Sequence, residues 1–370
     1  MYEHLNLKAW PFQIVPDSDF ATVWAGRKET KEQIQRLLFS MQFAPKSGLR
    51  LLWANFGMGK THTLFHLQHL CKQTKGKLIP VYAVMPQRAT GFIELYRAIV
   101  SVLPYDFLGE QLVKVGNSSQ GSVTLNPIFE KSPGVVNALL AMRSGDAERG
   151  TAARQWLAAQ PGLSSHDLHS VGVTYRIKTP EDAVNSLTTL TRLATFKSNP
   201  LAKLVIMVDE YQRIGELRSK VMQEINSGLH TYFNENPKAL EILLSFSFGR
   251  EDNVSYLLTN EIRSRAEPQT ISLDVLTEAQ AVEFVRELLA QFRLNPDDRW
   301  AYPFATDAID ILVKEIGKRN AITPRRLMLY ANHALVESQY SHSIDQGKEI
   351  TADEIKHILA DPRLGMMDTV

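Results

Sequence analysis

The chain has 370 residues, of which 44% are hydrophobic and 22% charged, with 41 Lys plus Arg against 40 Asp plus Glu and one cysteine. This composition excludes a disordered, collagen-like or coiled-coil protein and predicts one large core or two modest ones. A lone cysteine cannot form an internal disulfide, and no apolar run reaches the roughly 18 to 20 residues that cross a bilayer, so we expect a cytoplasmic protein without a membrane partner. The net charge of +1 leaves open whether a local basic surface binds nucleic acid.

Short apolar runs alternate with helical stretches along most of the chain, as expected of a parallel sheet covered by helices. We expect strands at residues 49–53, 78–85, 204–208, 242–248 and 270–273. Between the second and third strands we expect a helix at 91–102, a loop at 116–122 and a helical insertion at 134–159 and 180–196. After Leu276 the periodicity is helical only, and we expect helices at 277–291, 305–318, 323–339 and 352–360.

The most informative stretch joins the first expected strand to a helix. It runs Ala54-Asn55-Phe56-Gly57-Met58-Gly59-Lys60-Thr61-His62. Gly57 and Gly59 allow the backbone to turn its N–H groups toward phosphate oxygens, and the helix adds the positive end of its dipole. We therefore expect residues 55–62 to bind a nucleotide, with Lys60 on the β and γ phosphates and the Thr61 hydroxyl on Mg²⁺. Ala54 stands where the usual pattern has its first glycine, and it needs only a permissive backbone there.

A second candidate site lies where the third expected strand ends in Asp209 and Glu210. The carboxyl ends of parallel strands meet at one edge of a sheet, so both carboxylates would face the phosphate loop. Asp209 is then placed to hold Mg²⁺ through water, and Glu210 to orient or deprotonate the attacking water. The alternative is a strand that ends in a solvated acidic turn, and the order of this pair after Lys60 and Thr61 favours the catalytic interpretation.

With these motifs the sequence resembles the AAA+ class of ATPases, over about residues 26–335. The resemblance implies a sensor-one residue near the end of the fourth strand, for which Ser247 is the candidate and Ser245 the alternative. It also implies an arginine finger that reaches the ATP of a neighbouring subunit: Arg265, with Arg263 as the alternative. A planar guanidinium can neutralise transition-state charge on the phosphoryl oxygens. A basic cluster at a helix end is the other interpretation of this segment.

Two further matches concern the start of the helical part and the segment before the first strand. Residues 322–327 are similar to sensor two, in which Arg325, projecting from the start of a helix, reaches the γ-phosphate, with Arg326 as the alternative. Gly26-Arg27-Lys28-Glu29 is similar to the box by which initiator-like AAA+ and STAND proteins frame the adenine, which makes Arg27 a nucleotide-binding candidate.

The resemblance implies the α/β fold class: a P-loop NTPase (AAA+) with a five-stranded parallel sheet, helices on both faces and a small all-helical lid. The expected divisions are an N-terminal segment (1–25), an AAA+ core (26–276) with a helical insertion at about 105–196, a lid (277–340) and a tail with a short helix (341–370). The implied activity is Mg²⁺-dependent hydrolysis of ATP to ADP and phosphate.

Two narrower resemblances disagree about the biological process. Residues 5–12 and 16–20 look like the opening of ExeA-like and TniB/TnsC-type transposition regulators, whereas residues 57–62, 154–157 and 171–173 are similar to ATP-binding proteins of BREX-type phage-defence loci. Both imply an ATP-dependent switch that forms a homo-oligomeric ring or filament, binds DNA or recruits an effector protein. The alternatives are a STAND-like scaffold with little turnover and an ExeA-like assembly ATPase.

Other polar and aromatic residues have weaker interpretations. Arg143, Arg149 and Arg154 are candidate contacts for DNA phosphates, with solvated surface charge as the alternative. Three histidines at helical spacing, with Cys71 nearby, raise the question of a metal site, although packing and polar contacts are the preferred interpretation. They are His62, His66 and His69. Tyr82, Phe92 and Tyr96 are expected to be core aromatics.

Overall fold

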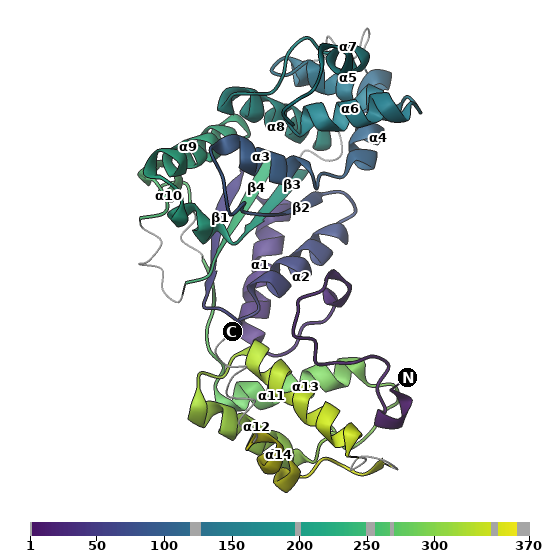
Figure 1. Cartoon of the computed structure of the whole chain (residues 1–370), viewed down its shortest axis with the longest axis vertical. Coiled ribbons are helices and arrows are strands. Elements are labelled where there is room, and N and C mark those ends of the chain that lie inside the picture. The colour runs from purple at the N-terminus through teal and green to yellow at the C-terminus, as the bar shows by residue number, and fades with distance from the viewer. Residues whose placement is uncertain are drawn as a thin grey trace. The chain divides into compact units, whose positions relative to one another are not determined.

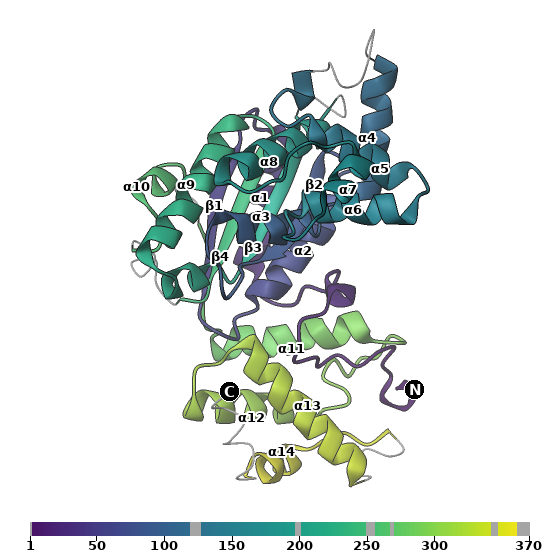
Figure 2. The same ribbon diagram turned by 45° about the horizontal axis from the view of Figure 1, so that its top comes forward.

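The structure is a computed structural model, and it describes residues 2–118, 127–196, 201–248, 256–266, 270–341 and 347–360. The chain divides into two compact units, each of which is drawn from separate stretches of sequence (Figures 1 and 2). The sheet unit comprises Ile34–Trp53 and Leu67–Ile271, and the helical unit comprises Met1–Gln33, Ala54–His66 and Ser272–Val370.

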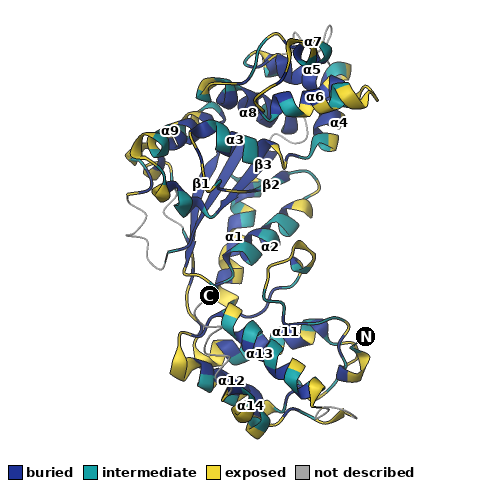
Figure 3. Cartoon of the chain, viewed as in Figure 1, coloured by how far each residue is buried: buried dark blue, intermediate teal, exposed yellow. Residues whose placement is uncertain are grey.

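A five-stranded parallel sheet forms the centre of the sheet unit, as the sequence predicts. The strands are β1 (Gly48–Ala54), β2 (Leu78–Val84), β3 (Lys203–Asp209), β4 (Leu240–Phe246) and β5 (Ile271–Leu273). Their order is β2-β3-β4-β1-β5, with Val84 opposite Asp209 and Trp53 opposite Phe246. Every residue of β1, β3 and β4 is buried (Figure 3), because helices cover both faces of the sheet, and most residues of these strands are apolar.

Helices α3, α8 and α9 cover one face of the sheet, and α1 and α2 cover the other (Figure 1). The helices that lie wholly or partly in this unit are α1 (Lys28–Phe43), α2 (Lys60–Lys72), α3 (Phe92–Val100), α4 (Tyr105–Ser118), α5 (Gly134–Arg143), α6 (Ala147–Leu157), α7 (Ser165–Val171), α8 (Pro180–Ala194), α9 (Ser219–Glu235) and α10 (Asn260–Arg263). The short 3₁₀ helices are η4 (Pro127–Phe129) and η5 (Tyr211–Glu216). Trp156 and Leu187 of the insertion share one hydrophobic core with Ile206 of β3, so the insertion extends this core.

The insertion contains two helices that the sequence analysis does not predict, and one break. The expectation of a loop at 116–122 is wrong for residues 116–118, which end α4, while 119–122 lie outside the described residues. Leu108, Leu112 and Val115 form a buried stripe at helical spacing, and burial of that stripe outweighs the low helix propensity of the glycines in α4. Helix α7 is the second helix that was not predicted. Gly145, at φ 79°, separates α5 from α6 within the stretch 134–159 that was expected to be helical.

Charged side chains lie inside the sheet at the amino ends of its central strands. Lys203 Nζ lies 2.6 Å from Glu241 Oε1, and Arg50 Nε lies 3.6 Å from Glu241 Oε2. All three side chains are buried, and Gly48 leaves the space that the Glu241 carboxylate occupies. Two cations beside one carboxylate make its burial tolerable, because an unpaired buried charge costs several kcal/mol.

The helical unit contains both ends of the described chain. Its remaining helices are η1 (Glu3–Leu5), η2 (Ser18–Phe20), α11 (Glu278–Phe292), α12 (Thr306–Arg319), α13 (Pro324–Tyr340) and α14 (Ala352–Leu359). Leu5, Leu7 and Phe12 are buried in one hydrophobic core with residues of all four helices from α11 to α14. The N-terminal segment therefore completes the core of this unit. Within the described ranges, no helix combines the length and apolar character needed to span a bilayer.

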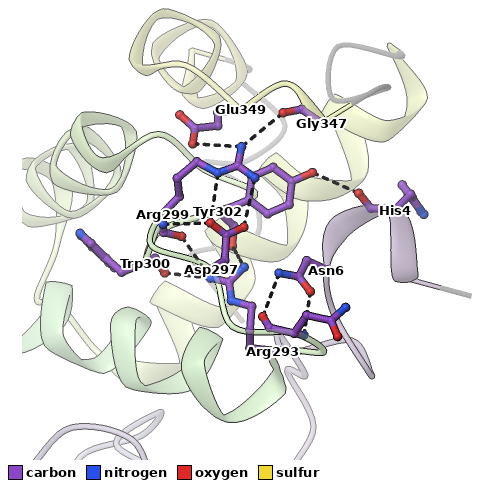
Figure 4. A network of polar contacts seen from close by, with 10 residues as sticks. His4, Asn6, Arg293, Asp297, Arg299, Trp300, Tyr302, Gly347 and Glu349 are labelled. Carbon is purple, nitrogen blue, oxygen red and sulfur yellow. Dashed lines mark hydrogen bonds and ion pairs between the residues drawn. The ribbon is translucent and has the colours of Figure 1, made fainter.

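Polar contacts also attach the N-terminal segment to the connection between α11 and α12 (Figure 4). The Asn6 amide donates to the backbone oxygen of Asn295 at 3.1 Å and accepts from its backbone nitrogen at 2.9 Å. The Tyr302 hydroxyl donates to the backbone oxygen of His4, and the guanidinium of Arg293 donates to the backbone oxygen of Tyr302. These bonds satisfy backbone groups of a connection that has no regular secondary structure of its own.

Replacement of Phe12 by alanine tests whether the N-terminal segment stabilises the helical unit. Phe12 is 2% exposed and packs edge-to-face on Phe304, so Phe12→Ala should lower the free energy of unfolding by about 3–5 kcal/mol. Val15 is 75% exposed, so Val15→Ala should change the free energy of unfolding by less than about 0.5 kcal/mol. Urea unfolding of the full chain measures the free energy of unfolding of both variants, and equal losses in the two would contradict the placement of Phe12 in the core.

The single cysteine should be inert in the folded protein. Cys71 is fully buried, and burial followed by the nearby charge of Glu241 raises the pKa of its thiol to about 12. Because the thiolate is the reactive form, a disulfide reagent at pH 8 should label the native chain only after denaturant is added. A Val15→Cys variant provides the exposed control and should label one thiol at once. Rapid labelling of the native parent chain would contradict the burial of Cys71.

Candidate functional site

The loop between β1 and α2 has the backbone of an anion cradle. Gly57 and Gly59 lie in the left-handed region, at φ 77° and 89°, a conformation that L side chains rarely adopt. Ala54 is the last residue of β1 and is absent from the positive-φ residues, so alanine is tolerated where the usual pattern has glycine. Among the described residues, nothing lies within 4 Å of a Cβ built on Gly59, so the inner side of the loop is open for a ligand.

Lys60 is held over this loop by the carbonyl groups of the loop itself. Its ammonium group donates to the backbone oxygens of Ala54 and Asn55, both at 3.1 Å, and lies 5.5 Å from the centre of the Phe56 ring. Lys60 is buried, whereas Phe56 is 70% exposed, so the phenyl ring covers the ammonium from outside. The Lys60 ammonium group therefore lies against the first residues of the glycine loop.

The start of α13 contacts the phosphate loop directly. The backbone nitrogen of Arg325 donates to the Gly57 oxygen at 3.1 Å, and the Thr323 hydroxyl caps the helix by accepting from the Arg326 nitrogen. Arg325 is exposed, whereas the guanidinium of Arg326 donates to the backbone oxygen of Ala321. Of the two sensor-two candidates, Arg325 has its backbone on the loop and its side chain accessible.

The histidines of α2 bind the N-terminal segment. His62 Nε2 lies 2.8 Å from the backbone oxygen of Val23, and His66 Nδ1 lies 2.7 Å from that of Ala21, while the Trp24 ring packs on His66. Burial lowers the pKa of His62 against the opposing effect of the Val23 hydrogen bond. For His62 and His66 these are the packing and polar contacts that the sequence analysis preferred.

The same segment is attached to α11 and carries Arg27 beside the loop. The Gln291 side chain bonds both the nitrogen and the oxygen of Trp24, and Glu287 accepts from the Gly26 nitrogen. The Arg27 guanidinium donates to the Asp274 oxygen at 2.7 Å and lies 3.7 Å from the sulfur of Met58, which is buried. Burial lowers the pKa of Arg27 to about 10, opposed by Asp274, so Arg27 remains a cation at neutral pH.

In the sheet unit, the carboxylate of Asp209 is surrounded by neutral hydrogen-bond donors. Its Oδ1 accepts from the Ser245 hydroxyl and from the Glu210 nitrogen, and its Oδ2 accepts from the Tyr82 hydroxyl at 3.0 Å. Burial, followed by the charge of Asp209, raises the pKa of Tyr82 far above its usual value, so the phenol stays protonated and donates. Asp209 itself is 2% exposed and is held in one orientation.

Glu210 follows in the left-handed conformation, at φ 56° and ψ 33°, and its carboxylate lies against the end of β4. The Ser247 hydroxyl donates to Glu210 Oε1 at 3.2 Å, and the Gln212 amide donates to Oε2 at 2.7 Å. Arg213 lies 4.0 Å from the same Oε2 and donates to the backbone oxygen of Met85. The two serines are thus divided between the two carboxylates: Ser245 bonds Asp209 and Ser247 bonds Glu210.

Three residues that bond the acidic pair were missed by the sequence analysis: Tyr82, Gln212 and Arg213. Tyr82 was assigned to the core, but its two neighbours in β2, Val81 and Ala83, face the core helices, and strand alternation therefore turns Tyr82 to the face that carries Asp209. The sequence of β2 is apolar on both faces, so it does not mark the face that Tyr82 takes. The contacts of Gln212 and Arg213 follow from a turn whose path the sequence does not reveal.

The remaining candidates are arginines at the surface, all of them exposed except Arg149. Arg263 ends α10, and Arg265 follows it; both are exposed, and their placement does not distinguish which is the finger. Arg143 and Arg154 are exposed on α5 and α6, and Arg149 is half-buried on α6.

Comparison of the sequence with protein-family models and with curated proteins gives no match. Solved structures match by fold. The Orc1 protein of Aeropyrum pernix, in complex with DNA, is 13% identical with a TM-score of 0.53, covering 96% of this chain and 70% of that one. The Orc2 protein of Aeropyrum pernix, in ADPNP–ADP complexes, is 11% identical with a TM-score of 0.50, covering 90% of this chain and 67% of that one. The chain therefore has the AAA+ P-loop fold predicted from its sequence, and the matches leave the two narrower resemblances untested.

Alanine at Gly57 and at Gly59 should have different consequences. Both positions require φ near 80–90°, which costs alanine roughly 1–2 kcal/mol. Only at Gly57 would the new Cβ also lie 3.1 Å from Arg325 Cβ and 3.4 Å from Thr323 Oγ1. Gly57→Ala should therefore also weaken the bond from the Arg325 nitrogen, which hydrogen exchange of that amide measures. Equal protection of this amide in the two variants would contradict direct docking of α13 on the loop.

Proposed function

We propose that the chain is an Mg²⁺-dependent ATPase that hydrolyses ATP to ADP and phosphate and acts as an oligomerising switch. The observation that carries the proposal is the order of the strands. Strands β1 and β3 both flank β4 in parallel, so their carboxyl ends lie at the same edge of the sheet, and in sequence the glycine loop follows β1 and the acidic pair lies at the end of β3. A phosphate-binding loop and a carboxylate pair that follow such strands are the residues that phosphoryl transfer to water requires.

The residues present fit ATP and Mg²⁺. The positive φ angles of Gly57 and Gly59 suit a loop that binds phosphate through its N–H groups, and Lys60 would hold the phosphate oxygens together with the N-terminus of α2. Thr61 and Asp209 would hold Mg²⁺, a cation that prefers the oxygen ligands that a hydroxyl and a carboxylate provide. Bound there, Mg²⁺ would supply neutralisation of phosphoryl charge.

Glu210 is proposed as the group that orients and deprotonates the attacking water. Its side chain is about one quarter exposed, at 26%, so water reaches it, and Ser247 and Gln212 hold its carboxylate. Arg325 would reach the γ-phosphate from the start of α13, and Arg27 would contribute to the adenine side. Residues 55–62 as a whole would line the nucleotide, with Asn55, Phe56, Met58 and His62 contributing through the loop and the first turn of α2.

The arginine finger is proposed to come from a second copy of the chain. Arg265 is exposed beside the short helix α10, with Arg263 as the alternative, and such a cation can serve a neighbouring subunit. A site that needs a neighbour ties hydrolysis to a homo-oligomeric ring or filament. Loss of the γ-phosphate would then loosen the assembly.

DNA is proposed as the partner on which the switch acts. Support comes from the fold shared with Orc1 of Aeropyrum pernix, whose structure is a DNA complex. With a net charge of +1 the single chain has no overall attraction for DNA, so we propose that assembly brings together a basic surface, with Arg143, Arg149 and Arg154 as candidate contacts. Recruitment of an effector protein, in transposition or in phage defence, is the proposed output. A STAND-like scaffold would bind nucleotide without appreciable turnover, and single-turnover assays distinguish the two.

A mixing experiment tests both the ATPase and the shared site. Glu210→Gln removes the base and should lower kcat roughly 10²–10⁴-fold, and Arg265→Ala removes the finger and should lower it roughly 10³–10⁵-fold. In a mixture, a Glu210→Gln subunit can supply its Arg265 to a neighbour that retains Glu210, so part of the activity should return. ATPase rates are measured with and without duplex DNA.

Arg263→Ala decides between the two finger candidates: it should leave the rate close to that of the parent chain, whereas loss of rate in Arg263→Ala with parent-like turnover in Arg265→Ala would assign the finger to Arg263. Parent-like turnover in Glu210→Gln would overturn the ATPase assignment. Two inactive variants that fail to complement each other would overturn the shared site and leave the ATPase assignment in place.

A further inference from the structure

Gln212 forms a closed ring of hydrogen bonds with Glu210 and Ser247. The Gln212 amide nitrogen donates to Glu210 Oε2 at 2.7 Å, and its amide oxygen accepts from the Ser247 backbone nitrogen at 3.0 Å. The Ser247 hydroxyl closes the ring by donating to Glu210 Oε1 at 3.2 Å. A backbone N–H can only donate and an ionised carboxylate can only accept, so one orientation of the amide satisfies both partners.

The ring connects the segment that follows β3 with the segment that follows β4. Gln212 lies in η5, which follows β3, and Ser247 follows the last residue of β4. Glu210 has a left-handed backbone, which disfavours a non-glycine residue by roughly 1–2 kcal/mol, and its neighbours must hold it in place. Gln212 supplies that restraint at the carboxylate, and Ser247 anchors Gln212 to the sheet.

We infer that Gln212 is a positioning residue that sets the orientation of the Glu210 carboxylate for its reaction with water. The inference rests on the proposed ATPase function. A general base must lie within hydrogen-bond reach of the proton that it removes, and a misplacement of about 1 Å can cost about 10²-fold in rate. Each carboxylate oxygen has one of its lone pairs occupied by the ring, and the other remains available to water.

Arg213 cannot replace Gln212 in this task. It lies 4.0 Å from Glu210 Oε2 and is one quarter exposed, so it contributes a screened charge and no fixed direction. Tyr82 on β2 and Ser245 on β4 both donate hydrogen bonds to Asp209, so these two hydroxyls orient Asp209 and not Glu210. The Ser247 hydroxyl holds Oε1 directly, and among the described contacts of the Glu210 carboxylate the Gln212 amide is the one that connects Oε2 to the backbone nitrogen at the end of β4.

The test compares Gln212→Ala with Gln223→Ala. Gln212→Ala should lower kcat roughly 10- to 100-fold with KM for ATP, nucleotide affinity and the melting temperature close to those of the parent chain. Gln223 is exposed on α9, and its alanine variant should leave all four quantities unchanged. Loss of nucleotide affinity and of melting temperature together with kcat would indicate a structural role and overturn the inference.

A double variant shows whether Gln212 acts through Glu210. In single-turnover assays followed over hours, Gln212→Ala should lower the rate of the Glu210→Gln chain less than two-fold, because the carboxylate that it positions is gone. A full additional loss would overturn the inference. Parent-like kcat in Gln212→Ala, with Glu210→Gln inactive, overturns the inference alone. Parent-like kcat in Glu210→Gln overturns the ATPase proposal, and the inference with it.

Discussion

Burial of the Asp209 carboxylate is the constraint on which the carboxyl edge of the sheet depends. A carboxylate that is 2% exposed must be compensated by hydrogen bonds, and donors from β2, β4 and the turn after β3 supply them. The Met85 nitrogen also donates to the Asp209 backbone oxygen. Because one residue is bonded from both neighbouring strands, the positions of Tyr82 and Ser245 are fixed with it.

The two ends of the same sheet face compensate buried charge in different ways. At the amino ends, Glu241 is bonded by Lys203 and lies beside Arg50, so cations cancel its charge. At the carboxyl ends, the named donors to Asp209 are a hydroxyl, a phenol and an amide, which orient the carboxylate without cancelling its charge. The named donors fix the direction in which the Asp209 carboxylate points, whereas the cations beside Glu241 stabilise a carboxylate that is buried in the core.

The strands were predicted within two residues at each end, because parallel strands buried on both faces leave apolar runs that local periodicity detects. The glycine loop and the acidic pair were equally visible, since each is contiguous in sequence. Tyr82 and Gln212 were not found, because Tyr82 bonds a residue 127 positions away and Gln212 one 35 positions away. Helix α4 was missed because its glycines obscured a stripe whose burial depends on α5 and α8.

The phosphate loop and the acidic pair place different demands on their residues. The phosphate loop works through its backbone, so the requirement falls on conformation: Gly57 and Gly59 need positive φ, whereas Ala54, within β1, does not. The acidic pair works through side chains whose partners lie on separate strands, so a change in one donor alters the orientation of a carboxylate several residues away. Departures from the usual motif are therefore tolerated at strand positions of the loop, such as Ala54, and not at its left-handed positions. At the acidic edge, tolerance depends on whether a replacement can still donate: a hydroxyl can substitute for another hydroxyl at Ser245 or Ser247, but an apolar side chain of the same size cannot.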